Sequence, residues 1–199
     1  MNKIPQNLPS STTDKFLDLW LDLENYQSPY AQAVGDPGEI IFPLIKKKSI
    51  QSALISFGAG SIPGVGGVLS ILPETYLLLK LQARMIKDIA ILLGRESFLS
   101  KEILLYCLFK ESKINLLETS IRITGTKLLV RPISLDLITN IFYKLVLNKV
   151  GKNKNQKNQI LFSFISAITN GSISFLDTQI VGNTANSIFL SDIEFEEDI

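Results

Sequence analysis

The feature that most constrains this chain is a run without any charged residue, which extends from Ser49 to Pro73. Three consecutive lysines, Lys46, Lys47 and Lys48, come directly before it. As one helix, a window of this length is long enough to cross the hydrocarbon of a bilayer. An apolar run must be covered by protein or by lipid, so the rest of the chain is expected to pack on this segment or support its function.

Glycine and proline interrupt the uncharged run. The interrupting residues are Gly58, Gly60, Pro63, Gly64, Gly66 and Gly67. One interpretation is a transmembrane helix over 53–72, with the lysines on its cytoplasmic flank. A second is a helical hairpin that turns within these glycines and is buried or lies shallowly in a membrane. A third is a pair of core helices whose backbones approach at Gly60 and Gly64. We favour the hairpin because glycine and proline weaken a continuous helix.

A long helix is predicted after this run, over 74–93. Pro73 suits a first helical position, Glu74 suits the positive end of the helix dipole, and Gly94 suits the C-cap. Lys80, Arg84 and Asp88 recur on one face of this helix. They predict either a solvated stripe with an Arg84–Asp88 ion pair, or a basic row that contacts lipid phosphates or an acidic partner.

The remaining segments also indicate helices, so the predicted fold class is all-α. A helix is favoured over a strand in residues 16–26, another helix is expected over 39–57, and Ser100 is expected to cap the next one. Residues 114–129 also resemble a helix, with Gly125 late in it. Ser134 caps a helix that ends at Gly151, and 152–158 is the best linker candidate. Two short helices follow, separated near Gly171.

These elements predict one helical domain, built around the glycine-rich hairpin and the long helix, with a second, shorter hairpin near the C-terminus. An acidic N-terminal helix and loop occupy 1–38, the helical domain 39–190, and an exposed acidic tail 191–199. The charge is asymmetric. Residues 46–189 carry a net charge of +10, while both ends are acidic. A basic centre of this kind suits an anionic surface, or acidic ends that fold back on it.

Several function classes find little support. The chain has no histidine, and Cys107, its single cysteine, lies in an apolar run and is expected to be a core thiol, so we expect no metal site and no cofactor. Val68 follows Gly66-Gly67 where a phosphate-binding loop needs lysine. The lysines of 144–157 lack the interleaved aromatics of a nucleic-acid binder. The N-terminus lacks a secretory signal, so a cytoplasmic protein is expected, soluble or on the inner membrane face.

The segment ALISFGAGSIPGVGGVLSILPETYLLLKLQARMIKDIAILLGRE resembles the EcsC family of bacterial proteins. The matching features are Pro63-Gly64, Pro73-Glu74, Leu81-Gln82, Ile89-Ala90 and Gly94. The segment ITNGSISFLDTQIVGNTANSIF is similar to the C-terminal part of that family. Glu74 stands where an Asp is common, and Leu93 where an aromatic residue is frequent. The resemblance implies a helical, membrane-associated bacterial protein of undefined biochemistry.

Two function hypotheses from different classes follow. The first is a non-enzymatic, membrane-proximal binding module that uses the glycine-rich hairpin and the basic positions Lys46–Lys48, Lys80 and Arg84 to contact lipid head groups or a membrane partner. The alternative is a hydrolase or lipid-acting enzyme that uses Glu74 with Asp177. A weaker third option is a scaffold that self-associates through the glycines. The absence of histidine and of a nucleophile motif favours a non-enzyme.

Overall fold

The computed structural model describes residues 10–60, 68–110, 120–134, 137 and 161–196. The elements in these ranges, in chain order, are α1 (Ser10–Asn25), α2 (Gly38–Gly60), α3 (Val68–Leu92), the 3-10 helix η1 (Glu96–Phe98), α4 (Lys101–Phe109), β1 (Ile121–Thr124), β2 (Lys127–Val130), α7 (Leu161–Leu190) and β3 (Asp192–Phe195). The described part of the chain is therefore mostly helical, as predicted.

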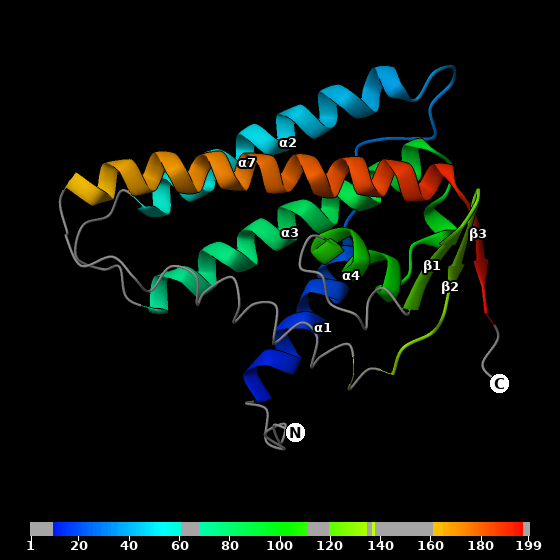
Figure 1. The fold of residues 1–199 in the computed structure, drawn as a ribbon, viewed down its shortest axis with the longest axis horizontal. Coiled ribbons are helices and arrows are strands. Elements are labelled where there is room, and N and C mark those ends of the chain that lie inside the picture. Colours follow the sequence, from blue (N-terminus) through cyan, green and yellow to red (C-terminus); the bar gives the residue numbers. More distant parts are fainter. Residues whose placement is uncertain (1–9, 61–67, 111–119, 135–136, 138–160, 197–199) are drawn as a thin grey trace.

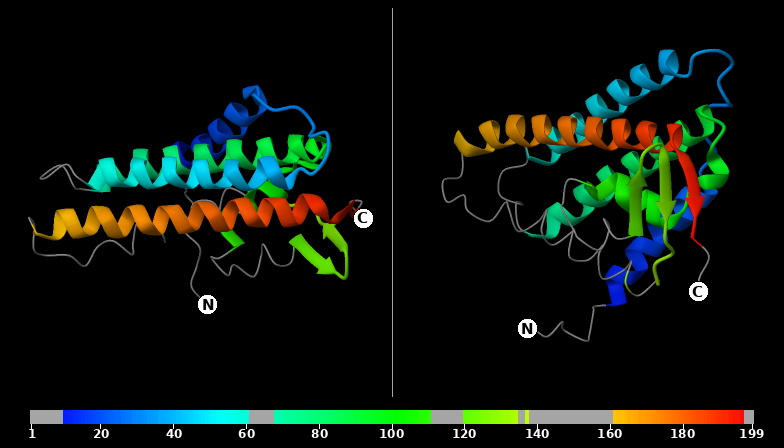
Figure 2. Two further views of the ribbon diagram at one scale, coloured as in Figure 1. Left: turned by 90° about the horizontal axis from the view of Figure 1, so that it is seen from above. Right: turned by 45° about the vertical axis from the view of Figure 1, so that its right-hand side comes forward.

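Three long helices form the body of the molecule. Helices α2 and α7 run side by side in opposite directions, and α3 packs against both of them (Figures 1 and 2). The small sheet, α4 and the C-terminal half of α3 lie at one end (Figure 1). Helix α1 packs along the outside of α3 near that end.

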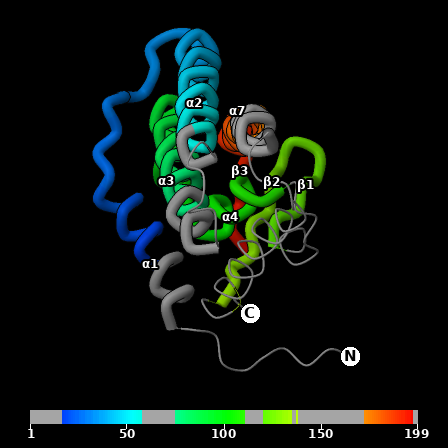
Figure 3. The backbone as a smooth tube through the Cα atoms, turned by 90° about the vertical axis from the view of Figure 1, so that its left-hand side faces the viewer, coloured from blue at the N-terminus to red at the C-terminus, as the bar shows by residue number. Residues whose placement is uncertain are grey.

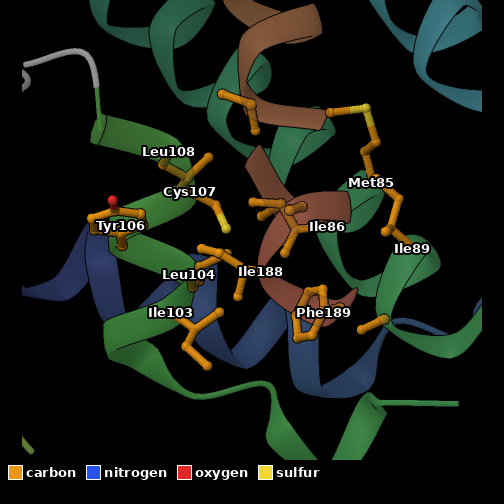
Figure 4. Packing of buried hydrophobic residues seen from close by; sticks show 14 of the residues in the cluster. Met85, Ile86, Ile89, Ile103, Leu104, Tyr106, Cys107, Leu108, Ile188 and Phe189 are labelled. Carbon is orange, nitrogen blue, oxygen red and sulfur yellow. The ribbon is translucent and has the colours of Figure 1, made fainter. Parts of the chain in front are cut away.

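The apolar core lies where α3, α4 and α7 meet. Ile86 and Ile89 of α3, Leu104 of α4 and Phe189 of α7 are fully or almost fully buried there (Figure 4). Cys107 lies among them, and its burial raises the pKa of the thiol. A buried thiol of raised pKa is unreactive, so the prediction of a core cysteine is confirmed.

The first two helices agree with the sequence prediction. Residues 16–25 belong to α1, and the α2 bounds lie close to the predicted 39–57. Leu19 and Leu23 of α1 are buried, four residues apart on one helix face. The alternating leucines of 17–23 are therefore divided between two sides of a helix, and the acidic residues between them remain outside the core.

The predicted C-cap of α3 and the predicted N-cap of α4, which lie on either side of η1, are confirmed. Gly94 has a φ of 66°, its N–H donates to Ile91 O over 2.9 Å, and the N–H of Arg95 donates to Ala90 O over 2.7 Å. This pair of bonds is the Schellman arrangement, which satisfies the last carbonyls of α3. Ser100 Oγ accepts from the N–H of Ile103 at the start of α4. The predicted start of the long helix was wrong, because α3 begins at Val68 and runs through Pro73.

A three-stranded sheet corrects the all-α prediction. Residues 121–130 are not helical but form the hairpin β1–β2, in which Thr124 pairs with Lys127 around a two-residue turn. Gly125 occupies that turn with a φ of 63°, a left-handed conformation that glycine adopts at little cost. Strand β3 then joins β2 in parallel, in the order β1-β2-β3. The predicted helix over 134–151 and the linker 152–158 lie outside the described residues, apart from Ser134 and Leu137.

The C-terminal region also departs from the prediction. Helix α7 runs without a break through Gly171, so the second, shorter hairpin was wrong. A glycine inside a helix costs about 1 kcal/mol, and the packing of α7 on α2 and α3 can outweigh this. The tail contributes a strand whose Ile193 is buried, and Glu194 and Glu196 pair with Lys127 and Arg131. These residues therefore fold back on the basic centre.

Candidate functional site

The end of the three-helix body that lies away from the sheet is the most unusual part of the molecule. We call it the distal end and define it as residues 49–60 of α2, 68–79 of α3 and 161–180 of α7. The three segments lie at the end of the helical body that is away from the sheet in Figure 1, and Figure 3 looks along α2, α3 and α7 from that side. Glu74 and Asp177 are the only charged residues in these ranges.

The side chains that α2 buries in the distal end are small and polar. Between Ser49 and Phe57, the buried positions are Ser49, Ser52 and Ser56. Their spacing of three and four residues places all of them on one helix face. That face packs against α7, where Thr178 is fully buried. Hydroxyl groups therefore occupy an interface that leucine and isoleucine fill elsewhere in this core.

A connected set of hydrogen bonds joins the three helices at this interface. Gln82 of α3 donates through Nε2 to Thr178 Oγ1 over 3.0 Å, and the Thr178 hydroxyl donates to Ser52 Oγ over 2.9 Å. Ser52 in turn donates to the carbonyl of Ser174 over 2.6 Å. Ser56 Oγ lies 2.6 Å from Ser174 Oγ. We call this set the hydroxyl seam.

One acceptor in the hydroxyl seam is unsatisfied. Gln82 is 2% exposed, and its Oε1 has no hydrogen-bond partner among the described residues. Leaving a buried acceptor unpaired costs about 1–3 kcal/mol of folding free energy, so this oxygen reduces the stability that the seam contributes. The satisfied bonds of the seam fix how the three helices pack against one another. Helix pairs joined by small residues and interhelical hydroxyl bonds are typical of packing in membranes, where burial of apolar surface does not drive association.

Large apolar side chains are exposed on the described part of the distal end. Side chains that are 36–64% exposed come from all three helices: Ile50, Leu54 and Phe57 of α2, Leu77 of α3, and Ile173, Leu176 and Ile180 of α7. On α2 and α7 these residues lie on the helix side opposite the hydroxyl seam, as their spacing of three and four residues requires. Among the described side chains of the distal end, the hydroxyls of Ser52, Ser56 and Thr178 are therefore buried, while large apolar groups face outward together with Gln51 and Ser172.

Basic residues lie next to the exposed apolar side chains on α2 and on α3. Lys46 and Lys47 are exposed and lie one turn before Ile50 on α2. Lys48 differs, because it is partly buried and burial lowers its pKa, an effect that the Asp88 carboxylate opposes. The predicted lysine triplet therefore divides into two solvent-facing lysines and one that faces α3.

The predicted basic row on α3 is neutralised from within the chain. Arg84 donates through Nε and Nη2 to the two carboxylate oxygens of Asp22, each over 3.0 Å, and Lys80 Nζ lies 2.6 Å from Asp22 Oδ1. Burial raises the pKa of Asp22, but the bonds and charges of Arg84 and Lys80 outweigh this and hold it below 3.8. The acidic partner considered for this row is therefore helix α1.

The predicted solvated stripe with an Arg84–Asp88 ion pair was wrong. Asp88 is fully buried and accepts hydrogen bonds from Ser28 Oγ over 2.7 Å and from the Tyr26 hydroxyl over 3.1 Å. Burial raises the pKa of Asp88, while these bonds and the charges of Lys48 and Arg84 oppose the rise. Burial and the Asp88 carboxylate raise the pKa of Tyr26 to about 12, so its hydroxyl remains a donor at neutral pH.

The glycine-rich turn and the candidate acids are only partly described. Gly58 and Gly60 end α2, whereas Pro63, Gly64, Gly66 and Gly67 lie outside the described residues. Glu74 belongs to α3, but its side chain lies outside them too, so the Glu74–Asp177 pair stays a prediction. Asp177 is partly buried in the middle of α7.

Two further properties concern the described ranges as a whole. No group of three or more potential metal ligands gathers there. Within the same ranges, none of the helices combines the length and the apolarity needed to cross a bilayer.

Sequence reasoning missed the hydroxyl seam. The signal is present in the sequence, because Ser49, Ser52 and Ser56 follow a helical spacing within the uncharged run. Asp22 belongs to the acidic N-terminal segment, but nothing in the sequence around it identifies Arg84 as its partner.

We compared the chain with protein-family models, with curated proteins and with solved structures, and nothing matches it in any of the three. The resemblance to the EcsC family therefore remains an expectation that rests on the residues quoted for it.

Proposed function

We propose that this protein is a membrane-docking module whose distal end enters the surface layer of a bilayer that contains anionic lipids. The observation that carries the proposal is that buried hydroxyls and exposed large apolar side chains occur together at the distal end. The hydroxyls of Ser52 and Thr178 are bonded inside the seam, and leucine, isoleucine and phenylalanine side chains from three helices are exposed. Such an arrangement leaves apolar area exposed in water but has that area covered in lipid.

Transfer of the apolar surface supplies the main driving force. Each half-exposed Leu, Ile or Phe side chain gains about 1 kcal/mol when its remaining surface leaves water. The exposed side chains from three helices together provide several kcal/mol, which suffices for reversible binding. Within each helix the backbone groups away from the ends are hydrogen-bonded to one another, as insertion into lipid requires.

Basic residues next to the apolar surface favour an anionic membrane over a neutral one. Lys46 and Lys47 are exposed and lie one turn from Ile50, so they approach the head groups when the exposed apolar side of α2 is inserted. Each basic residue near an anionic surface contributes about 1 kcal/mol, and salt weakens this contribution. The distal end itself carries Glu74 and Asp177 as its only charges, so repulsion from the membrane is small.

Vesicle flotation tests the proposal. The purified chain is mixed with phosphatidylcholine vesicles that contain about one third phosphatidylglycerol, or none, at low and high salt. The wild-type protein should float with the anionic vesicles, and Leu54→Ser or Leu176→Ser should weaken binding about three- to tenfold. Val34→Ser is the matched control, because Val34 is fully exposed in a loop outside the distal end.

The charge contribution has its own pair of variants. Lys47→Glu should reduce the affinity for anionic vesicles more than Arg122→Glu, which makes the same charge change on exposed strand β1. A chain that stays with the unbound fraction on every vesicle would refute membrane docking. Binding that is unchanged by Leu54→Ser and Leu176→Ser would refute the distal end as the docking surface.

A further inference from the structure

The Asp22 carboxylate is held the way a phosphate group is held. Arg84 offers two parallel N–H donors to its two oxygens, and the Lys80 ammonium contacts one of them. The Arg84 guanidinium also lies over the Tyr26 ring, 4.8 Å from the ring centroid, which fixes its plane. A planar fork of donors beside a lysine matches two oxygens of a phosphate as well as those of a carboxylate.

This ion pair is open to exchange. The side chains of Asp22, Lys80 and Arg84 are 20%, 30% and 35% exposed, so water and solutes reach all three. Pairs at this level of exposure contribute little net free energy, because hydration and side-chain entropy offset the attraction. Helix α1 does not depend on the pair, since Leu19 and Leu23 are buried and Lys87 donates to the carbonyls of Leu23 and Tyr26.

The pair also lies beside the apolar surface. Lys80 follows the exposed Leu77 by three residues on α3, about 4.5 Å along the helix axis and on the same side. When Leu77 enters the hydrocarbon boundary, Lys80 and Arg84 come to the depth of the head groups. An aspartate in that position faces like charges, which disfavours its remaining there.

We infer that Lys80 and Arg84 form a binding site for the phosphodiester of an anionic phospholipid, and that Asp22 occupies this site until the membrane displaces it. This inference rests on the proposed membrane docking and adds a second contact to it. Asp22 thereby lowers the affinity of the free protein for anionic surfaces. The exchange moves one side chain and leaves α1 in place.

Removal of the competing carboxylate gives the test. Asp22→Asn should tighten binding to vesicles with about one third phosphatidylglycerol roughly three- to tenfold. Asp18→Asn is the matched control, since it makes the same charge change one turn earlier on the exposed side of α1 and should shift affinity less than about twofold. Urea unfolding of both variants confirms that the fold is retained.

The double variant Asp22→Asn with Arg84→Gln should lose the gain in affinity, because the site itself is then removed. Retention of the gain in that double variant, or equal gains for Asp22→Asn and Asp18→Asn, would overturn the inference. A different outcome is that inorganic phosphate stabilises Asp22→Asn against urea while the variant binds vesicles no more tightly than wild type does. In that case the site binds a free anion and the lipid assignment is wrong.

The two proposals fail separately. A wild-type chain that binds no vesicle refutes membrane docking. A wild-type chain that binds anionic vesicles as tightly as Asp22→Asn leaves docking intact and refutes the competition by Asp22 alone.

Discussion

A Cβ atom at Gly182 of α7 would lie 2.7 Å from Cγ1 of Ile45 on α2. The two helices therefore approach each other more closely here than any residue other than glycine permits. Ile45 is buried and branched at Cβ, so its side chain cannot easily turn away. This contact lies on the same antiparallel helix pair as the hydroxyl seam and fixes the spacing of the pair.

Substitution of this glycine should destabilise the protein. We expect Gly182→Ala to lower the free energy of unfolding by about 1–2 kcal/mol, because the overpacking cost exceeds the gain of up to about 1 kcal/mol in helix propensity. Urea denaturation measures the change. Asn183→Ala is the control at the neighbouring exposed position and should stay within about 0.5 kcal/mol. A Gly182→Ala variant as stable as wild type would contradict this close approach.

The hydroxyl seam makes a second prediction. Thr178→Val keeps the shape of the side chain but removes the group that accepts from Gln82 and donates to Ser52. The loss of both bonds should cost about 1–3 kcal/mol in the free energy of unfolding. Thr178→Ser retains the hydroxyl and should cost less, although it removes a methyl group. If both variants lose the same stability, packing rather than hydrogen bonding explains the effect.

The buried carboxylate of Asp88 predicts a pH dependence. Its pKa in the folded protein is raised above 3.8, mainly by burial, so the folded state holds the proton more tightly than the unfolded state. The stabilisation from this group is complete below that value and is lost as the pH rises through the raised pKa. Asp88→Asn removes this loss, so the wild type should lose stability relative to the variant as the pH rises above 3.8 and through the raised pKa of Asp88.

Urea midpoints across that pH range test the Asp88 prediction. The lowered pKa of Asp22 acts in the opposite sense, with stabilisation that is present above 3.8 and lost on acidification below it. The two groups therefore act in different pH windows. A difference in stability between wild type and Asp88→Asn that stays constant as the pH rises above 3.8 would contradict a raised pKa at this site.

The turn of the β-hairpin predicts whether replacement of Gly125 raises or lowers the stability of the protein. In a helix, replacement of Gly125 by alanine would stabilise the chain by up to about 1 kcal/mol. In a turn with a φ of 63°, alanine is strained and should destabilise by about 1–2 kcal/mol. Thermal unfolding decides between the two. Gly125→Asn serves as the control, because asparagine tolerates the left-handed region better and should cost less than alanine.

The helices that carry their own end signals could be predicted from the sequence. Ser100 and Gly94 mark ends at which the local backbone requires a side-chain acceptor or a positive φ. The hairpin was missed because leucine-rich residues around 114–129 resemble a helix, although Ile121-Arg122-Ile123 alternates and Gly125 follows. The continuity of α7 through Gly171 depends on packing with α2 and α3, and a local pattern cannot reveal such packing.

The candidate site was predicted in part. The uncharged segment that forms the α2 part of the distal end was identified from the sequence, as were the lysines next to it. Helical structure on both sides of Gly171 was also predicted, but its position beside α2 depends on tertiary contacts such as that between Ser52 and Thr178. Pairing of Asp22 with Arg84 joins residues that are 62 positions apart, and charge balance alone indicates only that such pairing is possible.

The antiparallel packing of α2 on α7 has a consequence for how the chain folds. The hydroxyls of Ser52 and Thr178 are separated by 126 positions in the sequence. Closure of so long a loop gives the fold a high contact order, which slows folding. During synthesis, the serine face of α2 leaves the ribosome well before its partner exists. We therefore expect nascent chains of this protein to depend on an early surface, such as a membrane or a chaperone, that covers α2 until α7 arrives.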